Sequence, residues 1–356
     1  MSATAYLVLK NGRVFEGRSF GASGETLGEV VFTTGMTGYL ETLTDPSYNG
    51  QIVVQTFPLI GNYGVIPEDF EHPDVQPKGY IVREWCRRPS NFRSRGDIDA
   101  FLRERGIVGL WGIDTRELTR IIRDEGVMSG AIAPSLDAVD AGRIRAFRIE
   151  DAVAQVSVRE VRREAPPDPL HRVVLWDCGV KENIVRSLLA RGCEVIQVPH
   201  DTAAERILAF EPDGVMLSNG PGDPAENIGI IAELRKVADA KVPIFGICLG
   251  HQILALAMGG RTEKLKYGHR GTNQPARDVR TGRVSITTQN HGYAVVAESI
   301  GRDVGEVRYV NANDGTCEGV DYTCIPAFTV QFHPEAAAGP HDTSFLFERF
   351  LQLMAP

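Results

Sequence analysis

Short apolar stretches separated by turn residues are the dominant pattern in the first half of the chain. Asn11-Gly12 stands between two of them and is a strong hairpin signal. After Asp114 the apolar positions change to a helical spacing, and the first turn of that helix is acidic. The first half is therefore predicted to be β-rich with a few helices. The predicted strands occupy residues 6–9, 14–15, 30–33, 51–55 and 78–82.

In the second half, apolar strands alternate with amphipathic helices. This alternation predicts an α/β domain with a mostly parallel sheet flanked by helices. Ligands of such sheets bind beyond the carboxyl ends of the strands. Two loops at these ends, after Leu217 and after Ile247, therefore become candidates for chemistry. The predicted strands are residues 172–176, 194–198, 214–217 and 243–247, and the predicted helices are residues 182–191, 203–210 and 228–240.

The composition changes between the two halves. Residues 162–170 read RREAPPDPL, a charged and proline-rich stretch that is typical of a linker. We therefore expect an N-terminal domain at residues 1–155, a linker at 156–170 and a C-terminal domain at 171–356.

The net charge and the cysteine spacing argue against several classes of partner and site. The net charge of -8 argues against nucleic acid or an anionic membrane as the main partner. The six cysteines include no C-x-x-C pair, so no metal site is predicted. The chain shows neither a secretory signal nor an apolar run long enough to cross a bilayer, which favours a cytoplasmic protein.

The segment G-I-C-L-G-H-Q, residues 246–252, is the first candidate for chemistry. An apolar strand runs into a glycine-framed turn and then into a helix, which is the pattern of a nucleophile elbow. Cys248 would lie at the helix N-terminus, where the helix dipole favours a thiolate, and the amide of Leu249 would face a developing oxyanion. A cysteine that ends a buried strand is more often only part of the core, so its position alone does not decide.

Two further motifs complete the chemistry. His333-Pro334-Glu335 supplies a general base and a carboxylate that orients it, although such a loop is more often a capped turn. The loop S-N-G-P-G-D-P after Leu217 offers glycine amides at Gly220 and Gly222, although a surface turn is the simpler interpretation.

Together and in this order, the three motifs resemble those of class I glutamine amidotransferases. The first half resembles the N-terminal domain of the carbamoyl phosphate synthase small subunit, and the likeness to that subunit runs essentially end to end, including residues 177–181 at the start of the second half. The resemblance implies that Cys248, His333 and Glu335 form a triad that hydrolyses glutamine through a thioester. One departure is that Ala337 and Ala338 stand where the family commonly has serine and proline. The N-terminal segments that carry the likeness are residues 32–39, 43–48, 61–64 and 113–120.

The resemblance also implies a set of glutamine-binding residues. One comes from the first domain and the others surround the nucleophile in the second. His251 and His291 are interpreted as structural, because neither has a nearby carboxylate in the sequence to orient it. The implied residues are Ser47, Gly220, Gly222, Leu249, Gln252, Asn290, Gly292 and Tyr293.

A partner follows from the same resemblance. Ammonia from L-glutamine would pass to a large synthetase subunit, in a heterodimer or higher heteromer, that makes carbamoyl phosphate from bicarbonate and ATP for pyrimidine and arginine synthesis. The chain has no G-x-x-x-x-G-K-[ST] loop, so ATP and metal ions are expected in that subunit and no cofactor in this chain. The N-terminal domain is expected to dock the partner. The alternatives are a non-catalytic docking or regulatory subunit and a cysteine hydrolase of γ-glutamyl or peptide bonds.

Overall fold

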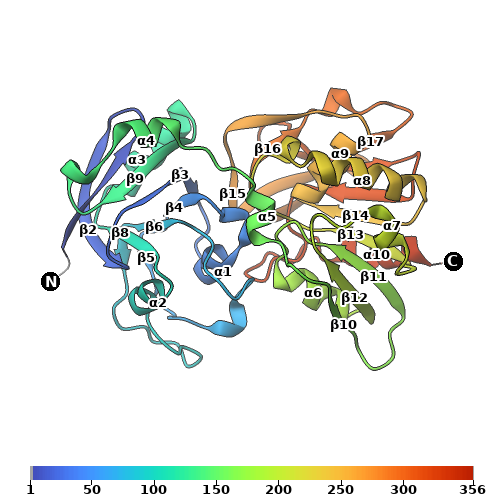
Figure 1. Cartoon of the computed structure of the whole chain (residues 1–356), viewed down its shortest axis with the longest axis horizontal. Coiled ribbons are helices and arrows are strands. Elements are labelled where there is room, and N and C mark those ends of the chain that lie inside the picture. Colours follow the sequence, from blue (N-terminus) through green and yellow to red (C-terminus); the bar gives the residue numbers. More distant parts are fainter. Residues whose placement is uncertain (1–2, 356) are drawn as a thin grey trace. The chain divides into compact units, whose positions relative to one another are not determined.

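A computed structural model describes residues 3–355, and the chain divides into two compact units, Met1–Glu150 and Asp151–Pro356 (Figure 1). The boundary comes before the linker predicted at residues 156–170. Part of that segment belongs to the second unit, because β10 (Arg162–Glu164) pairs antiparallel with β12 (Cys193–Val198). Its charges form ion pairs there, for example between Arg163 and the buried Glu194. No helix in residues 3–355 is long and apolar enough to cross a membrane.

The first unit is built on a closed barrel of seven strands in the order β1-β2-β8-β6-β4-β3-β9. The predicted hairpin around Asn11-Gly12 is confirmed, with β1 and β2 paired antiparallel. Alternate residues of the strands enter two buried clusters, one shared with α1 and α2 and the other with α3. The strands are β1 (Thr4–Leu9), β2 (Val14–Gly21), β3 (Thr26–Thr33), β4 (Gln51–Gln55), β6 (Gly79–Val82), β8 (Val108–Trp111) and β9 (Met128–Ala133), with a separate pair β5 (Leu59–Ile60) and β7 (Glu84–Trp85). The helices are α1 (Tyr39–Thr44), α2 (Ile98–Glu104), α3 (Thr115–Glu125) and α4 (Ala141–Ala146).

The second unit contains one sheet of ten strands. Its strands β12, β11, β13, β14 and β19 are parallel neighbours in that order, as the strand–helix alternation predicted. Beyond β19 the sheet is antiparallel, so the sheet as a whole is mixed. The remaining strands are β11 (His171–Trp176), β13 (Gly214–Leu217), β14 (Ile244–Ile247), β15 (Thr262–Asp278), β16 (Val284–Val295), β17 (Gly305–Asn311), β18 (Cys317–Tyr322) and β19 (Ala327–Val330).

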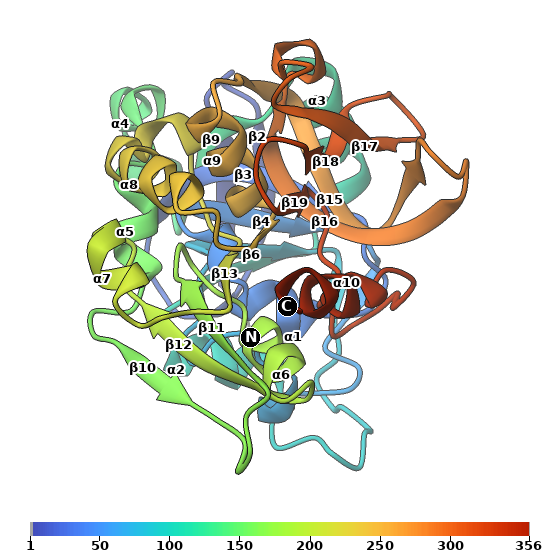
Figure 2. The same cartoon turned by 90° about the vertical axis from the view of Figure 1, so that its right-hand side faces the viewer.

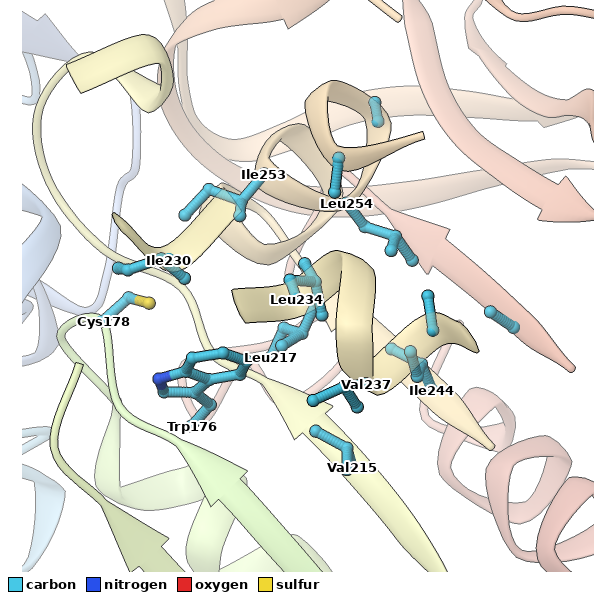
Figure 3. Packing of buried hydrophobic residues seen from close by; sticks show 14 of the residues in the cluster. Trp176, Cys178, Val215, Leu217, Ile230, Leu234, Val237, Ile244, Ile253 and Leu254 are labelled. Carbon is cyan, nitrogen blue, oxygen red and sulfur yellow. The ribbon is translucent and has the colours of Figure 1, made fainter. Parts of the chain in front are cut away.

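Helices cover both faces of the parallel strands. Along β11, Val174 and Trp176 face α7, α8 and α9, whereas Val173 and Leu175 face α6 and α10. Figure 2 shows the two groups of helices on opposite sides of β11–β13, and Figure 3 shows Trp176 and Leu217 packed under Leu234 and Ile253. The helices of this unit are α5 (Ala152–Val156), α6 (Glu182–Leu189), α7 (Ala204–Leu208), α8 (Ile228–Asp239), α9 (Leu249–Ala257) and α10 (Phe345–Met354).

Candidate active site

Cys248 occupies a strained turn between β14 and α9. Its φ of 54° and ψ of -101° place a residue with a Cβ in a region that mostly glycine adopts. The neighbouring glycines make this turn possible: a Cβ on Gly250 would lie 2.5 Å from the carbonyl oxygen of Leu217, and one on Gly246 would lie 2.9 Å from the backbone of Gly250. The elbow predicted from the sequence is therefore present.

The sulfur of Cys248 is directed towards β16. The side chain is buried, and its Sγ lies 3.7 Å from the carbonyl oxygen of Asn290. The Cys248 amide donates to the carbonyl of Val330 at 2.8 Å, which fixes the elbow to the end of β19. The nucleophile is thus held by the two segments that also carry the other predicted site residues.

His333 and Glu335 form a buried pair just after β19. His333 Nδ1 lies 2.6 Å from Glu335 Oε1, and both residues are almost inaccessible to solvent. Because β14 and β19 are parallel neighbours, the chain leaves both strands at the same edge of the sheet, next to Cys248. The structure therefore brings the three predicted triad residues together.

His333 and Glu335 shift each other's pKa in opposite directions, so that each favours the charged form of the other. Burial alone would lower the pKa of His333, but the charges of Glu335 and Cys248 outweigh burial and the nearby Lys181 ammonium, so the pKa is raised. Burial alone would likewise raise the pKa of Glu335, but His333 and Lys181 lower it. The favoured state is an imidazolium beside a carboxylate.

The two nitrogens of the His333 ring differ in their surroundings. Nδ1 is bound by Glu335, whereas the buried Nε2 has no hydrogen-bond partner among the described residues. Cys248 interacts strongly enough with the ring to raise its pKa, yet the Cys248 thiol donates to Asn290. The sulfur of Cys248 is therefore already close to the His333 ring.

Lys181 is a site residue to which the sequence analysis assigned no role. Its side chain is buried, and its Nζ lies 3.1 Å from His333 Nδ1 and 3.3 Å from Glu335 Oε1. It follows β11, whose carboxyl end is at the same sheet edge as β14. A lysine in the loop between a buried parallel strand and the next helix was the signal that could have found it.

The Gly-Pro loop after β13 packs against the elbow. A Cβ on Gly220 would lie 2.1 Å from the carbonyl oxygen of Cys178 and 2.7 Å from the Leu249 side chain, so only glycine fits there. Gly222 has a φ of 87°, which also favours glycine. The loop predicted to expose backbone amides thus lies beside the residue that follows the nucleophile.

The remaining predicted residues of the second unit lie on α9 and β16. Gln252 donates from Nε2 to the carbonyl of Tyr293 at 2.7 Å and to Gln331 Oε1 at 2.8 Å, which joins the helix to the strand. Asn290 is buried, and Gly292 lies on the same strand.

Ser47 belongs to the first unit, in the short 3-10 helix Pro46–Tyr48, where its amide donates to Asp45 Oδ1 at 2.9 Å. Its role in glutamine binding stays a prediction.

Two other histidines have the structural surroundings that the sequence suggested. His251 is buried, its Nδ1 lies 2.7 Å from Thr329 Oγ1, and burial lowers its pKa to about 3. His291 lies between Gln289 and the carbonyl of Tyr293, and burial lowers its pKa as well. Both are therefore neutral near pH 7.

The turn that departs from the family pattern is held by hydrogen bonds from other residues. The turn carries Ala337 and Ala338, followed by Gly339. The hydroxyl of Thr288 on β16 donates a hydrogen bond to the carbonyl of Gly339 at 2.8 Å. The side chain of Asn183 also donates to the carbonyl of Glu335. The turn is therefore bonded to β16 and α6 even though this chain lacks the serine hydroxyl that the family commonly has there.

Two family models match the chain. Residues 7–132 match the CPSase domain of the carbamoyl-phosphate synthase small chain, and residues 174–353 match glutamine amidotransferase class-I. A carbamoyl phosphate synthase small chain from Fusobacterium nucleatum is 50% identical, with 97% of each chain covered. Those from Bacillus caldolyticus and Bacillus anthracis are 51% and 52% identical, covering 98% of this chain and 96% and 95% of theirs.

Proposed function

The chain belongs to the carbamoyl phosphate synthase small chain family, and from this premise we propose that it hydrolyses L-glutamine and supplies ammonia to a large synthetase subunit. The observation that carries the proposal is the strained Cys248 beside a buried His333–Glu335 pair. That arrangement provides a nucleophile, a group that transfers protons and a carboxylate that holds the imidazole.

In the first half of the reaction, the Cys248 thiolate attacks the carbon of the glutamine side-chain amide. The negative charge moves to the amide oxygen, and we assign its binding to backbone N–H groups of Leu249 and of the Gly220 loop. His333, whose pKa is raised by Glu335, gives its proton to the departing nitrogen, so ammonia leaves and a thioester remains on Cys248.

In the second half, water hydrolyses the thioester. Neutral His333 takes a proton from the water, hydroxide adds to the carbonyl carbon, and the C–S bond breaks to release glutamate and the Cys248 thiolate. Glu335 keeps its hydrogen bond to Nδ1 throughout, which leaves Nε2 as the nitrogen that exchanges protons.

We assign partner docking to the first unit. The class-I amidotransferase region is confined to residues 174–353, whereas residues 7–132 match a model named for the carbamoyl-phosphate synthase small chain. The unit presents two strongly exposed apolar side chains, Phe92 at 97% and Met36 at 69%. Phenylalanine and methionine are enriched in protein interfaces relative to the rest of the protein surface. ATP, bicarbonate and metal ions are assigned to the large subunit.

The experiment for the chemistry is Cys248→Ser in the complex with the large subunit. Glutamine-dependent carbamoyl phosphate synthesis should be lost, while synthesis from added ammonia should continue. Glutamine turnover near that of the wild type would refute the assignment. The same comparison tests the non-catalytic alternative, since a docking subunit would show no glutaminase activity even as wild type.

The experiment for docking is Phe92→Asp, with Leu136→Asp as the matched control at another exposed apolar position of the unit. Phe92→Asp should weaken co-purification with the large subunit by at least tenfold in affinity, as expected for the loss of roughly 1.4 kcal/mol. An unchanged affinity would remove Phe92 from the interface.

A further inference from the structure

A second buried histidine–carboxylate cluster lies in the antiparallel part of the second sheet and has no part in the reaction described above. His269 on β15 has its Nε2 2.9 Å from Asp314 Oδ2 and its Nδ1 3.5 Å from Glu318 Oε1. Glu318 is completely buried, and His269 is 8% exposed. Buried charges are costly unless they are paired and hydrogen-bonded, so such a cluster requires a reason.

Glu318 connects three chain segments. Its carboxylate accepts hydrogen bonds from Gln289 Nε2 at 2.9 Å and from Asn311 Nδ2 at 3.0 Å. Its backbone carbonyl accepts from the amide of Gln331 at 2.9 Å. Gln289 lies on β16, and Gln331 is two residues before His333.

These segments are the ones that hold the reacting groups. The carbonyl of Thr288, next to Gln289, accepts from the amide of His333 at 2.9 Å. The carbonyl of Asn290, on the other side of Gln289, faces Cys248 Sγ at 3.7 Å. A shift of the Gln289 segment therefore moves the surroundings of both the sulfur and the imidazole.

The cluster is a hydrogen-bonded network rather than a metal site. Ligand atoms of His269, His291 and Glu318 lie within 4.8 Å of one another. However, the Gln289 carboxamide connects two of them, with its Oε1 3.0 Å from His291 Nε2 and its Nε2 donating to Glu318. Ligand atoms of His291 and Glu318 are thus already bonded to the Gln289 carboxamide.

We propose that Glu318, which lies 3.5 Å from His269 Nδ1, is a positioning residue of the glutaminase site that sets the distance between Cys248 and His333. This inference rests on the triad roles proposed above. Glu318 acts through Gln289 and through Gln331, which also receives a hydrogen bond from Gln252 on the helix after the nucleophile.

The ionisation of His269 supports the ion pair. Burial alone would lower its pKa, but hydrogen bonds and charges of Glu318 and Asp314 outweigh burial, and the pKa is raised. The titratable groups that face His269 are Glu318 from β18, Asp314 from the turn after β17 and His291 from β16. His291 is neutral, because burial lowers its pKa. His269 therefore keeps its proton to a higher pH than a free imidazole does, and loses it as the pH rises through the raised pKa.

The main test is Glu318→Gln in the complex with the large subunit. The new side chain carries an NH₂ group where one carboxylate oxygen was, so it cannot accept both the hydrogen bond from Gln289 and the one from Asn311. The Gln289 segment should then shift, and a misplacement of reacting groups by about 1 Å costs roughly a hundredfold in rate. We expect glutamine turnover per site to fall roughly tenfold to a hundredfold, where sites are counted by stoichiometric labelling of Cys248 with a glutamine-mimicking electrophile. Counting sites separates slow sites from unfolded protein.

The matched control is Asp278→Asn. Asp278 ends β15 in the same sheet and forms an ion pair with Arg308 at 2.7 Å, but none of its hydrogen bonds among the described residues goes to Gln289 or Gln331. Its turnover per site should stay within twofold of the wild type. Equal losses in Glu318→Gln and Asp278→Asn, or a turnover within twofold in Glu318→Gln, would overturn the proposal.

A second variant keeps the test valid if Glu318→Gln does not fold. His269→Gln removes the ion pair but leaves the amide bonds to Glu318. The ratio of wild-type to variant turnover should fall towards one as the pH rises through the raised pKa of His269 and wild-type His269 loses its proton. A ratio that does not change with pH would overturn the proposal. Failure of Cys248→Ser to abolish turnover would instead refute the triad, so the two failures are distinguishable.

Discussion

The second unit contains two buried histidine–carboxylate pairs that differ in what surrounds the ring. His333 has one nitrogen on Glu335, while its other nitrogen has no partner among the described residues and lies beside Cys248. His269 has a carboxylate near each nitrogen, Asp314 at 2.9 Å and Glu318 at 3.5 Å.

The difference shows that a buried histidine–carboxylate pair does not by itself make a catalytic site. A ring held on both sides can carry charge and fix its neighbours, but it has no nitrogen left to exchange protons with a substrate. A ring held on one side only, next to a sulfur on a strained turn, can do so. We therefore assign chemistry to His333 and positioning to His269 and Glu318.

The largest effect is expected for His333→Asn. Loss of the group that transfers protons should slow single-turnover thioester formation by a factor of hundreds or more, since general acid–base help is worth roughly 10²–10⁴. His269→Asn is the matched change in the other pair and should cost far less. Similar losses in the two variants would contradict the division of roles.

A smaller effect is expected for Glu335→Gln. The amide retains the shape of the side chain but removes the charge that raises the pKa of His333. Turnover should fall roughly tenfold, which corresponds to the loss of one charge-assisted hydrogen bond. The pH profile of kcat/KM should move to lower pH. A profile in the wild-type position would mean that Glu335 does not control the ionisation of His333.

Lys181→Met should move the same profile in the opposite direction. The Lys181 ammonium lowers the pKa of His333, so its removal should raise that pKa and shift the profile of kcat/KM to higher pH. The expected loss of turnover near neutral pH is a few-fold. Opposite shifts in Glu335→Gln and Lys181→Met would show that both groups act on one imidazole, whereas shifts in the same direction would refute this.

The smallest effect is expected for Asp314→Asn. Asp314 lies near the outer nitrogen of His269, while Glu318 keeps its bonds to Gln289 and Asn311 in the variant. Turnover should stay within about twofold, and the pKa of His269 should fall because one of the charges that raise it is gone. NMR titration of the His269 ring would measure that shift. A loss of turnover as large as that of Glu318→Gln would mean that Asp314, and not Glu318, positions the glutaminase site.

The parallel strands and the elbow were predictable from sequence because their determinants are local. Apolar runs followed by helices indicate β11 to β14, and glycines on both sides of Cys248 indicate the turn. The antiparallel strands of the second unit were not predicted. Residues 262–278 are mostly polar and half-exposed, so they lack the apolar run that marks a buried strand.

Long-range pairing explains the rest. Glu318, Gln289 and His269 are separated by many residues in sequence and meet only because β15, β16, β17 and β18 pair in one sheet. Lys181 likewise reaches His333 across 152 residues. No local pattern distinguishes such side chains from ordinary polar residues. The triad was found because each of its motifs has a signature of its own.

The most direct test of the central claim is to label the chain with a glutamine-mimicking electrophile and to identify the modified cysteine by peptide mass spectrometry. The chain has six cysteines, and burial raises the pKa of Cys178, Cys193 and Cys317, which keeps these thiols protonated. We predict one label per chain, on Cys248, and protection by L-glutamine. A label on another cysteine, or labelling of Cys248 that L-glutamine does not prevent, would contradict the account.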